Sequence, residues 1–151
     1  MSKTLVAYFS YSGNAKAAAE KVAKIAEADL FEIQTVTPYS ADYQKCVDEA
    51  RKELQENARP GLTGKVEDMS SYDRIILGFP NWCSTCPMPV LSFLEEYDLQ
   101  GKKIDIFVTN GGGGTGNSAQ DIQKSAPGAK VSEAVNGNDL SESRIRNWLG
   151  L

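Results

Sequence analysis

Short apolar runs alternate with amphipathic stretches along the whole chain. Residues 3–10 (KTLVAYFS) and 72–80 (YDRIILGFP) are apolar runs that end in turn residues, which is typical of strands buried on both faces. Similar runs at 29–36, 102–110 and 129–135 predict three further strands, of which the last has the weakest pattern. Nearly continuous apolar strands of this kind belong to parallel sheets that helices cover on both sides.

Helical periodicity fills the intervals between these strands. The first interval predicts a helix over 16–28, and the shared apolar face consists of Ala15, Ala18, Ala19, Val22, Ile25 and Ala26. Further helices are predicted at 43–56, 89–99, 118–126 and 141–151. Strands that alternate with helices indicate an α/β fold with a doubly wound, five-stranded parallel sheet. A length of 151 residues suits a single domain over residues 1–151.

Three unusual loops follow the first, third and fourth of the long strands. They are SYSGNA at 10–15, PNW at 80–82 and NGGGGTGN at 110–117. In open α/β sheets, ligands bind at the carboxyl ends of the strands, near the point where the strand order reverses. The three loops are therefore expected to open on one edge of the sheet and to form one composite site.

The first loop has the composition of a phosphate cradle. Ser10, Ser12 and Asn14 supply polar side chains, Gly13 permits a positive φ, and the N-terminus of a helix follows at once. A plain strand-to-helix turn with a good N-cap fits this stretch equally well. The loop contains neither the Gly-Lys-Ser/Thr of a Walker A motif nor the Gly-x-Gly-x-x-Gly of a dinucleotide fold.

Composition narrows the classes of partner and of chemistry. The net charge of −4 argues against nucleic acid or an anionic membrane as the main partner. With no apolar run of about 18 residues and no signal pattern at the N-terminus, a cytoplasmic location is expected. Histidine is absent, which removes the commonest general base and most catalytic zinc sites and favours a bound cofactor as the reactive group.

Together, the three loops resemble those of the flavodoxin family. The resemblance lies in Ser-x-Ser-Gly-Asn at 10–14, LGFPNW at 77–82 and FVTNGGGGTGNS at 107–118, in this order and spacing. It spans nearly the whole chain and is nearest to short bacterial flavodoxin-like proteins. It implies a sheet in the order 2-1-3-4-5 and noncovalent binding of FMN.

The resemblance also implies a role for each matching residue. Ser10, Tyr11, Ser12, Gly13, Asn14 and Ala15 would hold the phosphate of FMN. Residues beside the flavin ring would be Pro80, Asn81, Trp82 and Cys83, with Trp82 stacking on the ring. The pyrimidine end would meet the backbone amides of Asn110, Gly111, Gly112, Gly113, Gly114 and Gly116. The second tryptophan, Trp148, is expected in the core.

Two departures from the family pattern affect the expected site. Ala15 stands where the family has threonine, so one hydroxyl donor to the phosphate is missing. Glycines of the third loop stand where many flavodoxins place an aromatic residue, which predicts that one face of the flavin is open. The segment from Tyr39 to Gly64 is expected to cover the sheet edge and shows no chemistry of its own.

Electron transfer through FMN is the expected function, with redox proteins or a small-molecule electron donor or acceptor as partners. The first alternative is an FMN-dependent NAD(P)H or quinone oxidoreductase whose substrate stacks on the open flavin face. A second alternative is a binding module that has lost its flavin.

Cys83 and Cys86 have the spacing of a redox dithiol, which leaves a thiol-disulfide function open. Small side chains that merely line the loop explain the pair equally simply. A zinc site needs four ligands, and the distant Cys46 is the one further cysteine, so no metal is expected. Because a helix N-terminus follows it, Cys86 is predicted to be the more reactive thiol of the pair.

Overall fold

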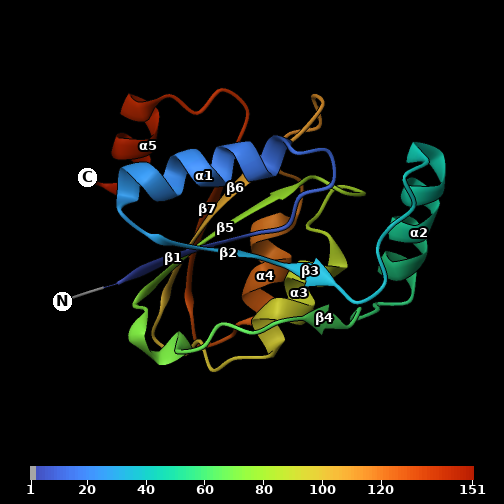
Figure 1. The fold of residues 1–151 in the computed structure, drawn as a ribbon, viewed down its shortest axis with the longest axis horizontal. Coiled ribbons are helices and arrows are strands. Elements are labelled where there is room, and N and C mark those ends of the chain that lie inside the picture. The colour runs from blue at the N-terminus through green and yellow to red at the C-terminus, as the bar shows by residue number, and fades with distance from the viewer. Residues whose placement is uncertain (1–2) are drawn as a thin grey trace.

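The computed structural model describes residues 3–151 and shows strands and helices in alternation (Figure 1). The strands are β1 (Thr4–Tyr8), β2 (Asp29–Glu32), β3 (Gln34–Thr35), β4 (Leu62–Thr63), β5 (Arg74–Pro80), β6 (Lys103–Thr109) and β7 (Lys130–Asn136). The helices are α1 (Asn14–Ala26), α2 (Tyr43–Gln55), α3 (Met88–Glu95), α4 (Ser118–Ser125) and α5 (Glu142–Leu149), and a 3-10 turn covers Met69–Ser71. Among residues 3–151, no helix combines the length and the apolar character that crossing a membrane requires.

The main sheet has five parallel strands in the order β2-β1-β5-β6-β7. Counted along the chain, this is the order 2-1-3-4-5, so the predicted fold class and strand order are confirmed. The central strand β5 pairs along its whole length with β6, from Arg74 opposite Lys103 to Pro80 opposite Thr109. The order reverses between β1 and β5, and the carboxyl ends of β1, β5 and β6 lie next to one another there.

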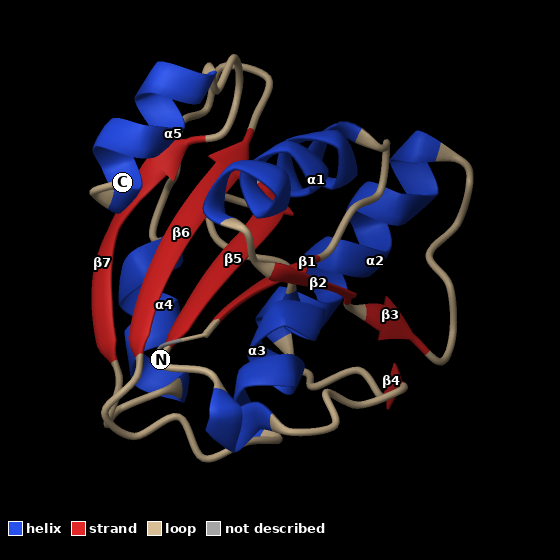
Figure 2. Cartoon of the chain, turned by 60° about the vertical axis from the view of Figure 1, so that its left-hand side comes forward, coloured by secondary structure: helices blue, strands red, loops and turns tan. Residues whose placement is uncertain are grey.

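Alternate residues of the central strands enter two apolar layers. Leu5 and Ala7 of β1 pack toward α3 and α4, while Val6 and Tyr8 pack toward α1 and α5. Figure 2 shows α1 and α5 on one face of the sheet and α3 and α4 on the other. Because both faces are covered, β1, β5 and β6 read as nearly continuous apolar runs in the sequence. Trp148, which was predicted to lie in the core, is half-buried and packs against the second layer, with its ring 6.1 Å from that of Phe107.

The predicted strand 29–36 is two short strands in the structure. β2 ends at Glu32, and the backbone N–H of Ile33 donates to the carbonyl of Tyr8 as the chain leaves the main sheet. β3 then pairs antiparallel with β4, a strand that the sequence did not predict. The sequence did not predict β4 because a strand of two residues is too short to show a periodicity, and because a proline-glycine break at Pro60 precedes it.

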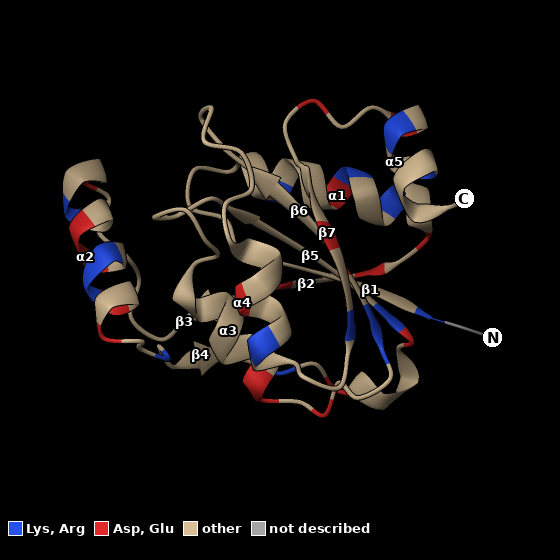
Figure 3. Ribbon diagram, turned by 180° about the vertical axis from the view of Figure 1, so that it is seen from behind, with Lys and Arg blue, Asp and Glu red and all other residues tan. Residues whose placement is uncertain are grey.

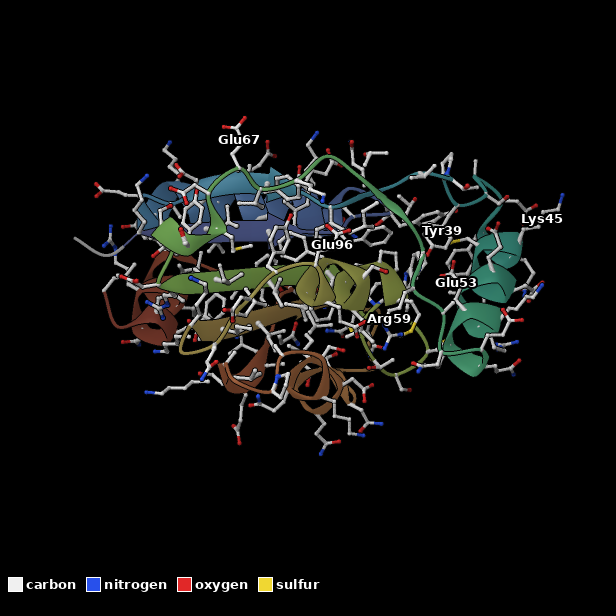
Figure 4. The ribbon with its side chains drawn as sticks, turned by 90° about the horizontal axis from the view of Figure 1, so that it is seen from below. Tyr39, Lys45, Glu53, Arg59, Glu67 and Glu96 are labelled. Atoms are coloured by element: carbon white, nitrogen blue, oxygen red, sulfur yellow. The ribbon has the colours of Figure 1, made fainter. Side chains whose placement is uncertain are left out.

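Helix α2 does not pack on the sheet like the other four helices. It stands beyond the carboxyl ends of the strands, at the far right of Figures 1 and 4. Its N-cap is Asp42, whose carboxylate accepts the backbone N–H of Lys45 at 3.1 Å. α3 is shorter than predicted and ends at Glu95, because the chain turns there to bury Leu99 in the core.

Candidate cofactor site

The three predicted loops do meet at one edge of the sheet. They follow β1, β5 and β6, which are neighbours in the sheet, and they lie on the same side as α2 (Figure 1). The structure therefore brings together the residues that the sequence assigned to one composite site. The meeting of the loops does not test which residue contacts which part of a ligand, so the role assigned to each residue stays a prediction.

The first loop is shaped around the hydroxyl of Ser10. Its oxygen accepts the backbone N–H of Gly13 at 3.1 Å and that of Lys16 at 3.3 Å, and so ties the loop to the first turn of α1. Gly13 has a φ of 96°, which a residue with a side chain rarely adopts. The loop therefore curls back on the start of the helix.

This curl leaves backbone donors pointing at no protein acceptor. The N–H groups of Tyr11, Ser12, Asn14 and Ala15 donate to no acceptor within the described residues, and the side chains of Ser12 and Asn14 are exposed. They lie at the N-terminus of α1, where the partial positive charge of the helix is concentrated. Unpaired N–H groups at a helix start form a site for an anion such as a phosphate.

A hollow of about 550 Å³ adjoins the first loop on the side of α1. Its wall includes Asn14 and Lys21 of α1 and Asn138 and Ser141 after β7. No residue of the loops 80–87 or 110–116 lines it. The acidic Asp139 also lines this hollow, and because the hollow touches only the first of the three loops it cannot hold a ring that contacts all three.

The second loop is a tight hairpin. Trp82 and Thr85 exchange backbone hydrogen bonds of 3.0 and 3.1 Å, and the two residues between them, Cys83 and Ser84, have φ values of 55° and 67°. Two positive φ values define a type I′ turn, which normally contains Asn-Gly. Non-glycine residues in this conformation are under strain of about 1–2 kcal/mol each. Surrounding structure must hold the turn in place.

The third loop supplies that support. The backbone N–H of Asn117 donates to the carbonyl of Ser84 at 2.7 Å, and Asn81 Nδ2 donates to the carbonyl of Gly114 at 3.0 Å. Gly116 lies so close that a Cβ atom there would fall 2.1 Å from the Ser84 carbonyl oxygen. The hydroxyl of Thr85 also donates to the carboxylate of Asp121 in α4. The second and third loops therefore form one locked pair.

Asparagines at the end of β7 and just after it anchor the third loop from its other side. Asn138 Oδ1 accepts the N–H of Asn110 at 3.1 Å, and Asn138 Nδ2 donates to the Asn110 carbonyl at 2.8 Å. Asn110 Nδ2 donates to Asn136 Oδ1, and Asn110 Oδ1 accepts the N–H of Gly112 at 3.0 Å. Asn136, the last residue of β7, and Asn138, which follows it, were missed because β7 has the weakest strand pattern. The backbone amides of Asn110 and Gly112 are thus occupied within the protein.

Trp82 lies at the centre of an aromatic cluster that comes from three segments. Its ring makes edge contacts with Phe9, Tyr11 and Tyr39, with centroids 5.3, 5.9 and 4.9 Å away. Tyr39 in turn donates a hydrogen bond to the carboxylate of Glu53 in α2, and Figure 4 shows these two side chains facing each other. Burial, followed by this hydrogen bond, raises the pKa of Tyr39, so its hydroxyl stays protonated as the donor.

The two cysteines of the second loop lie in opposite environments. Cys83 is exposed at the tip of the turn, whereas Cys86 is 1% exposed. Burial, and next the carboxylate of Asp121, raise the pKa of Cys86 to about 12. The prediction that Cys86 is the more reactive thiol is therefore wrong. The helix that follows cannot compensate for removing a thiolate from water.

The fold and the site together define a class of protein. A doubly wound sheet in the order 2-1-3-4-5 carries an anion cradle after its first strand and an aromatic residue in the loop after its central strand. This is the arrangement of an α/β protein that binds a mononucleotide at the switch point of its sheet. The flavodoxin family model matches residues 3–150, and the chain belongs to the flavodoxin family.

Solved structures of flavoproteins resemble the chain over almost its full length. A protein of Bacteroides eggerthii described as a flavoprotein is 34% identical, with a TM-score of 0.91, and the match covers 99% of this chain and 97% of that one. A second such protein, of Bacteroides uniformis, is 30% identical with a TM-score of 0.88 and 99% of both chains covered. A flavoprotein of Lactobacillus acidophilus, solved in complex with FMN, is 26% identical with a TM-score of 0.79 and 99% of both chains covered. A search of curated proteins finds no match.

Proposed function

We propose that this protein binds FMN noncovalently at the carboxyl edge of its sheet and transfers electrons between redox partners. The observation that carries the proposal is the set of N–H groups of Tyr11, Ser12, Asn14 and Ala15, which have no acceptor among residues 3–151 and lie at the start of α1, beside Trp82. Membership of the flavodoxin family and the FMN complex of the Lactobacillus acidophilus flavoprotein support FMN as the cofactor.

The first loop fits the phosphate of FMN. Four unpaired backbone donors and the exposed side chains of Ser12 and Asn14 lie within residues 11–15, at a helix N-terminus, and residues 10–16 contain no acidic side chain. A single terminal phosphate can use all of these donors. A triphosphate would need a lysine of the Walker type, and the loop has none.

The other two loops fit the flavin ring. Trp82 offers an aromatic surface, and the backbone amides of Gly111, Gly113, Gly114 and Gly116 have no acceptor within residues 3–151. FMN itself supplies the redox chemistry, since it can accept or donate one or two electrons. The protein residues bind and orient the ring, and no histidine is needed as an acid or base.

Two measurements test this function. Mass spectrometry of the cofactor released from purified protein is expected to give FMN, and a dominant FAD signal would contradict the proposal. The FMN-loaded protein, reduced by dithionite without oxygen, is expected to reduce a one-electron acceptor such as cytochrome c. If FMN binds and no acceptor protein or dye is reduced faster than by free reduced FMN, the cofactor assignment stands and the carrier role fails.

A small-molecule reductase is the second candidate, and a cavity favours it. Between α2 and the second loop lies a space of about 210 Å³ that Trp82 lines. Steady-state oxidation of NADH or NADPH by the FMN-loaded protein separates this candidate from a pure carrier. Turnover with a quinone would favour the reductase, and its absence would leave the carrier.

A thiol-disulfide function has lost support. Cys86 is buried with a raised pKa, so it does not provide the thiolate that such an exchange requires. Cys83 alone is exposed among the three free cysteines. The second loop therefore uses its cysteines as small side chains in a tight turn.

A further inference from the structure

Helix α2 closes the ring end of the proposed cofactor site. A cavity of about 210 Å³ lies between α2 and the loops that follow β1 and β5. Tyr11 and Trp82 line this cavity from the loops, and Cys46 and Ala50 line it from α2. Sites that hold a drug-sized ligand have roughly 300–1,000 Å³. With α2 in this place, the space beside Trp82 is therefore smaller than a ligand of the size of a flavin requires.

Little apolar contact holds α2 on the rest of the fold. Two of its 13 residues, Cys46 and Ala50, are buried, whereas seven of the eight residues of α3 are buried. Figure 3 shows α2 at one end of the molecule, with acidic and basic residues along its length. Segments that bury few apolar side chains open at a lower free energy than the core does. α2 is thus able to open while the sheet and its two apolar layers stay intact.

The hydrogen bonds of α2 are also nearly all local. Within the described part of the chain, the hydrogen bonds of residues 41–58 go to partners between 39 and 59, apart from a contact of the Cys46 thiol with the Tyr11 hydroxyl. None of the ion pairs found in residues 3–151 includes a residue of this segment. Residues 41–58 can therefore move as a unit without breaking a hydrogen bond of the sheet.

Both ends of this segment are fixed to the rest of the protein. Before it, Tyr39 packs edge-on against Trp82, with ring centroids 4.9 Å apart. After it, Arg59 Nε donates to the carboxylate of Glu95 in α3 at 2.9 Å. The part that is free to move therefore lies between these two anchors.

Two hydrogen bonds hold α2 against the anchor that precedes it. The hydroxyl of Tyr39 donates to the carboxylate of Glu53, and Figure 4 shows these side chains facing each other. The backbone N–H of Ser40 donates to Glu49 Oε1 at 2.9 Å. Ser40 is itself fixed, since its carbonyl accepts the Tyr11 hydroxyl at 2.6 Å. Breaking the two bonds to Glu49 and Glu53 frees α2 and leaves the anchor in place.

We propose that residues 41–58 form a lid over the ring end of the cofactor site, and that the Tyr39–Glu53 and Ser40–Glu49 hydrogen bonds latch it. The lid is closed most of the time, because each bond shifts the equilibrium by up to about tenfold. When the latch opens, α2 moves away from Trp82 and the ligand enters or leaves. The proposal rests on the proposed function in one respect, that this ligand is FMN.

Thiol labelling measures the opening of the lid without any ligand. Cys46 on α2 is 3% exposed and Cys86 in the core is 1% exposed, so each thiol reacts when its surroundings open. In a Cys83→Ser variant, which lacks the exposed thiol, iodoacetamide is expected to alkylate Cys46 at least about tenfold faster than Cys86, as measured by mass spectrometry of peptides. Equal rates would mean that α2 opens only when the whole protein unfolds, and would overturn the lid.

Tyr39→Phe, made in the same variant, tests the latch. The phenylalanine keeps the ring contact with Trp82 and loses the hydrogen bond to Glu53. Labelling of Cys46 is expected to become up to about tenfold faster, while labelling of Cys86 stays the same. An unchanged rate at Cys46, or an equal rise at both thiols, would overturn the latch.

Tyr72→Phe is the matched control for this variant. The hydroxyl of Tyr72 also donates to a carboxylate, that of Asp29 at 2.6 Å, and the pair lies at the amino ends of β5 and β2, away from α2. The control therefore removes the same kind of hydrogen bond and is expected to leave the labelling of Cys46 unchanged. If it speeds this labelling as much as Tyr39→Phe does, the effect is one of general stability and the latch fails.

The rates of FMN exchange test what the lid controls. Since the flavin passes the open lid in both directions, Tyr39→Phe is expected to raise the rates of FMN binding and of FMN release alike, by up to about tenfold, and to change the Kd much less. Stopped-flow recording of flavin fluorescence gives both rates, and Tyr72→Phe should change neither. Faster release with an unchanged rate of binding would mean that the Tyr39 hydroxyl stabilises the bound state alone, and would overturn the lid.

These experiments separate the lid from the proposed function. If FMN binds and both rates stay the same in Tyr39→Phe, the cofactor assignment stands and the lid fails. If FMN does not bind, while Cys46 is labelled faster than Cys86 and responds to the latch, the lid stands and the proposed function fails.

Discussion

The loop after β1 and the paired loops after β5 and β6 lie at the same edge of the sheet but differ in how their hydrogen-bonding groups are used. The first leaves the N–H groups of residues 11, 12, 14 and 15 without an acceptor among residues 3–151. The paired loops bond to each other through Asn81, Ser84 and Asn117, and to the loop after β7 through Asn110 and Asn138. The first loop thus has free donors that can bind an anion, while the hydrogen bonds of the paired loops hold them in a fixed shape. Changes in the paired loops should alter stability, and changes in the first should alter affinity.

Gly116→Ala should have the largest effect, because it separates the paired loops. Its Cβ would fall 2.1 Å from the Ser84 carbonyl oxygen, at a φ of 57° that alanine adopts with strain. We expect the free energy of unfolding to fall by about 3 kcal/mol in a urea titration. Gly111→Ala is the control, since a Cβ there meets no atom within 4 Å, and it should change stability by less than about 0.5 kcal/mol. Equal effects would refute the coupling of the loops.

Asn138→Ala should remove the anchor of the third loop. The backbone N–H and carbonyl of Asn110 both lose their partner, which is expected to lower the free energy of unfolding by about 1–2 kcal/mol. FMN affinity should fall less than stability, because the unpaired donors of the first loop are untouched. Asn147→Ala, on the exposed side of α5, serves as the neutral control. Indistinguishable unfolding curves for the two variants would mean that the anchor contributes nothing.

Ser84→Gly should stabilise the protein, in contrast to the two preceding variants, which should destabilise it. Ser84 has a φ of 67° in the tight turn, and glycine adopts this conformation without strain. We expect a gain of up to about 1 kcal/mol in the free energy of unfolding, reduced by the greater freedom of glycine in the unfolded chain. Ser84→Ala keeps the strain and should show no gain. A gain in both variants would assign the effect to the hydroxyl group.

Ala15→Thr should have the smallest effect, and its main effect should be on affinity. Ala15 is buried, at 2% exposure, and its N–H is one of the unpaired donors at the start of α1. A threonine hydroxyl there should tighten FMN binding several-fold, and at most about tenfold, in a fluorescence titration of apoprotein. Ala17→Thr, at an exposed position of α1, should leave the affinity unchanged. A flat or weakened affinity in Ala15→Thr would place the phosphate elsewhere.

The pattern of apolar and polar residues alone was enough to predict the central strands and the topology of the sheet. Strands β1, β5 and β6 are buried on both faces, so their residues are apolar without interruption and the sequence predicted them with small errors at the ends. Parallel strands and helical crossovers then fixed the topology, and the three loops had to meet at one edge. The glycine and serine residues of those loops could be recognised in the sequence, because their roles depend on residues that are close to them along the chain.

Tertiary structure decided what depends on distant neighbours. The burial of Cys86 and the positive φ values of Cys83 and Ser84 follow from contacts with α4 and with the third loop, more than 30 residues away. Asn136 and Asn138 gain their role because β7 ends beside β6. Likewise, α2 has an ordinary amphipathic pattern, and only the docking of Tyr39 on Trp82 and on Glu53 turns its inner face toward the site. Periodicity reports that a helix has a buried face, and only the folded chain shows what that face covers.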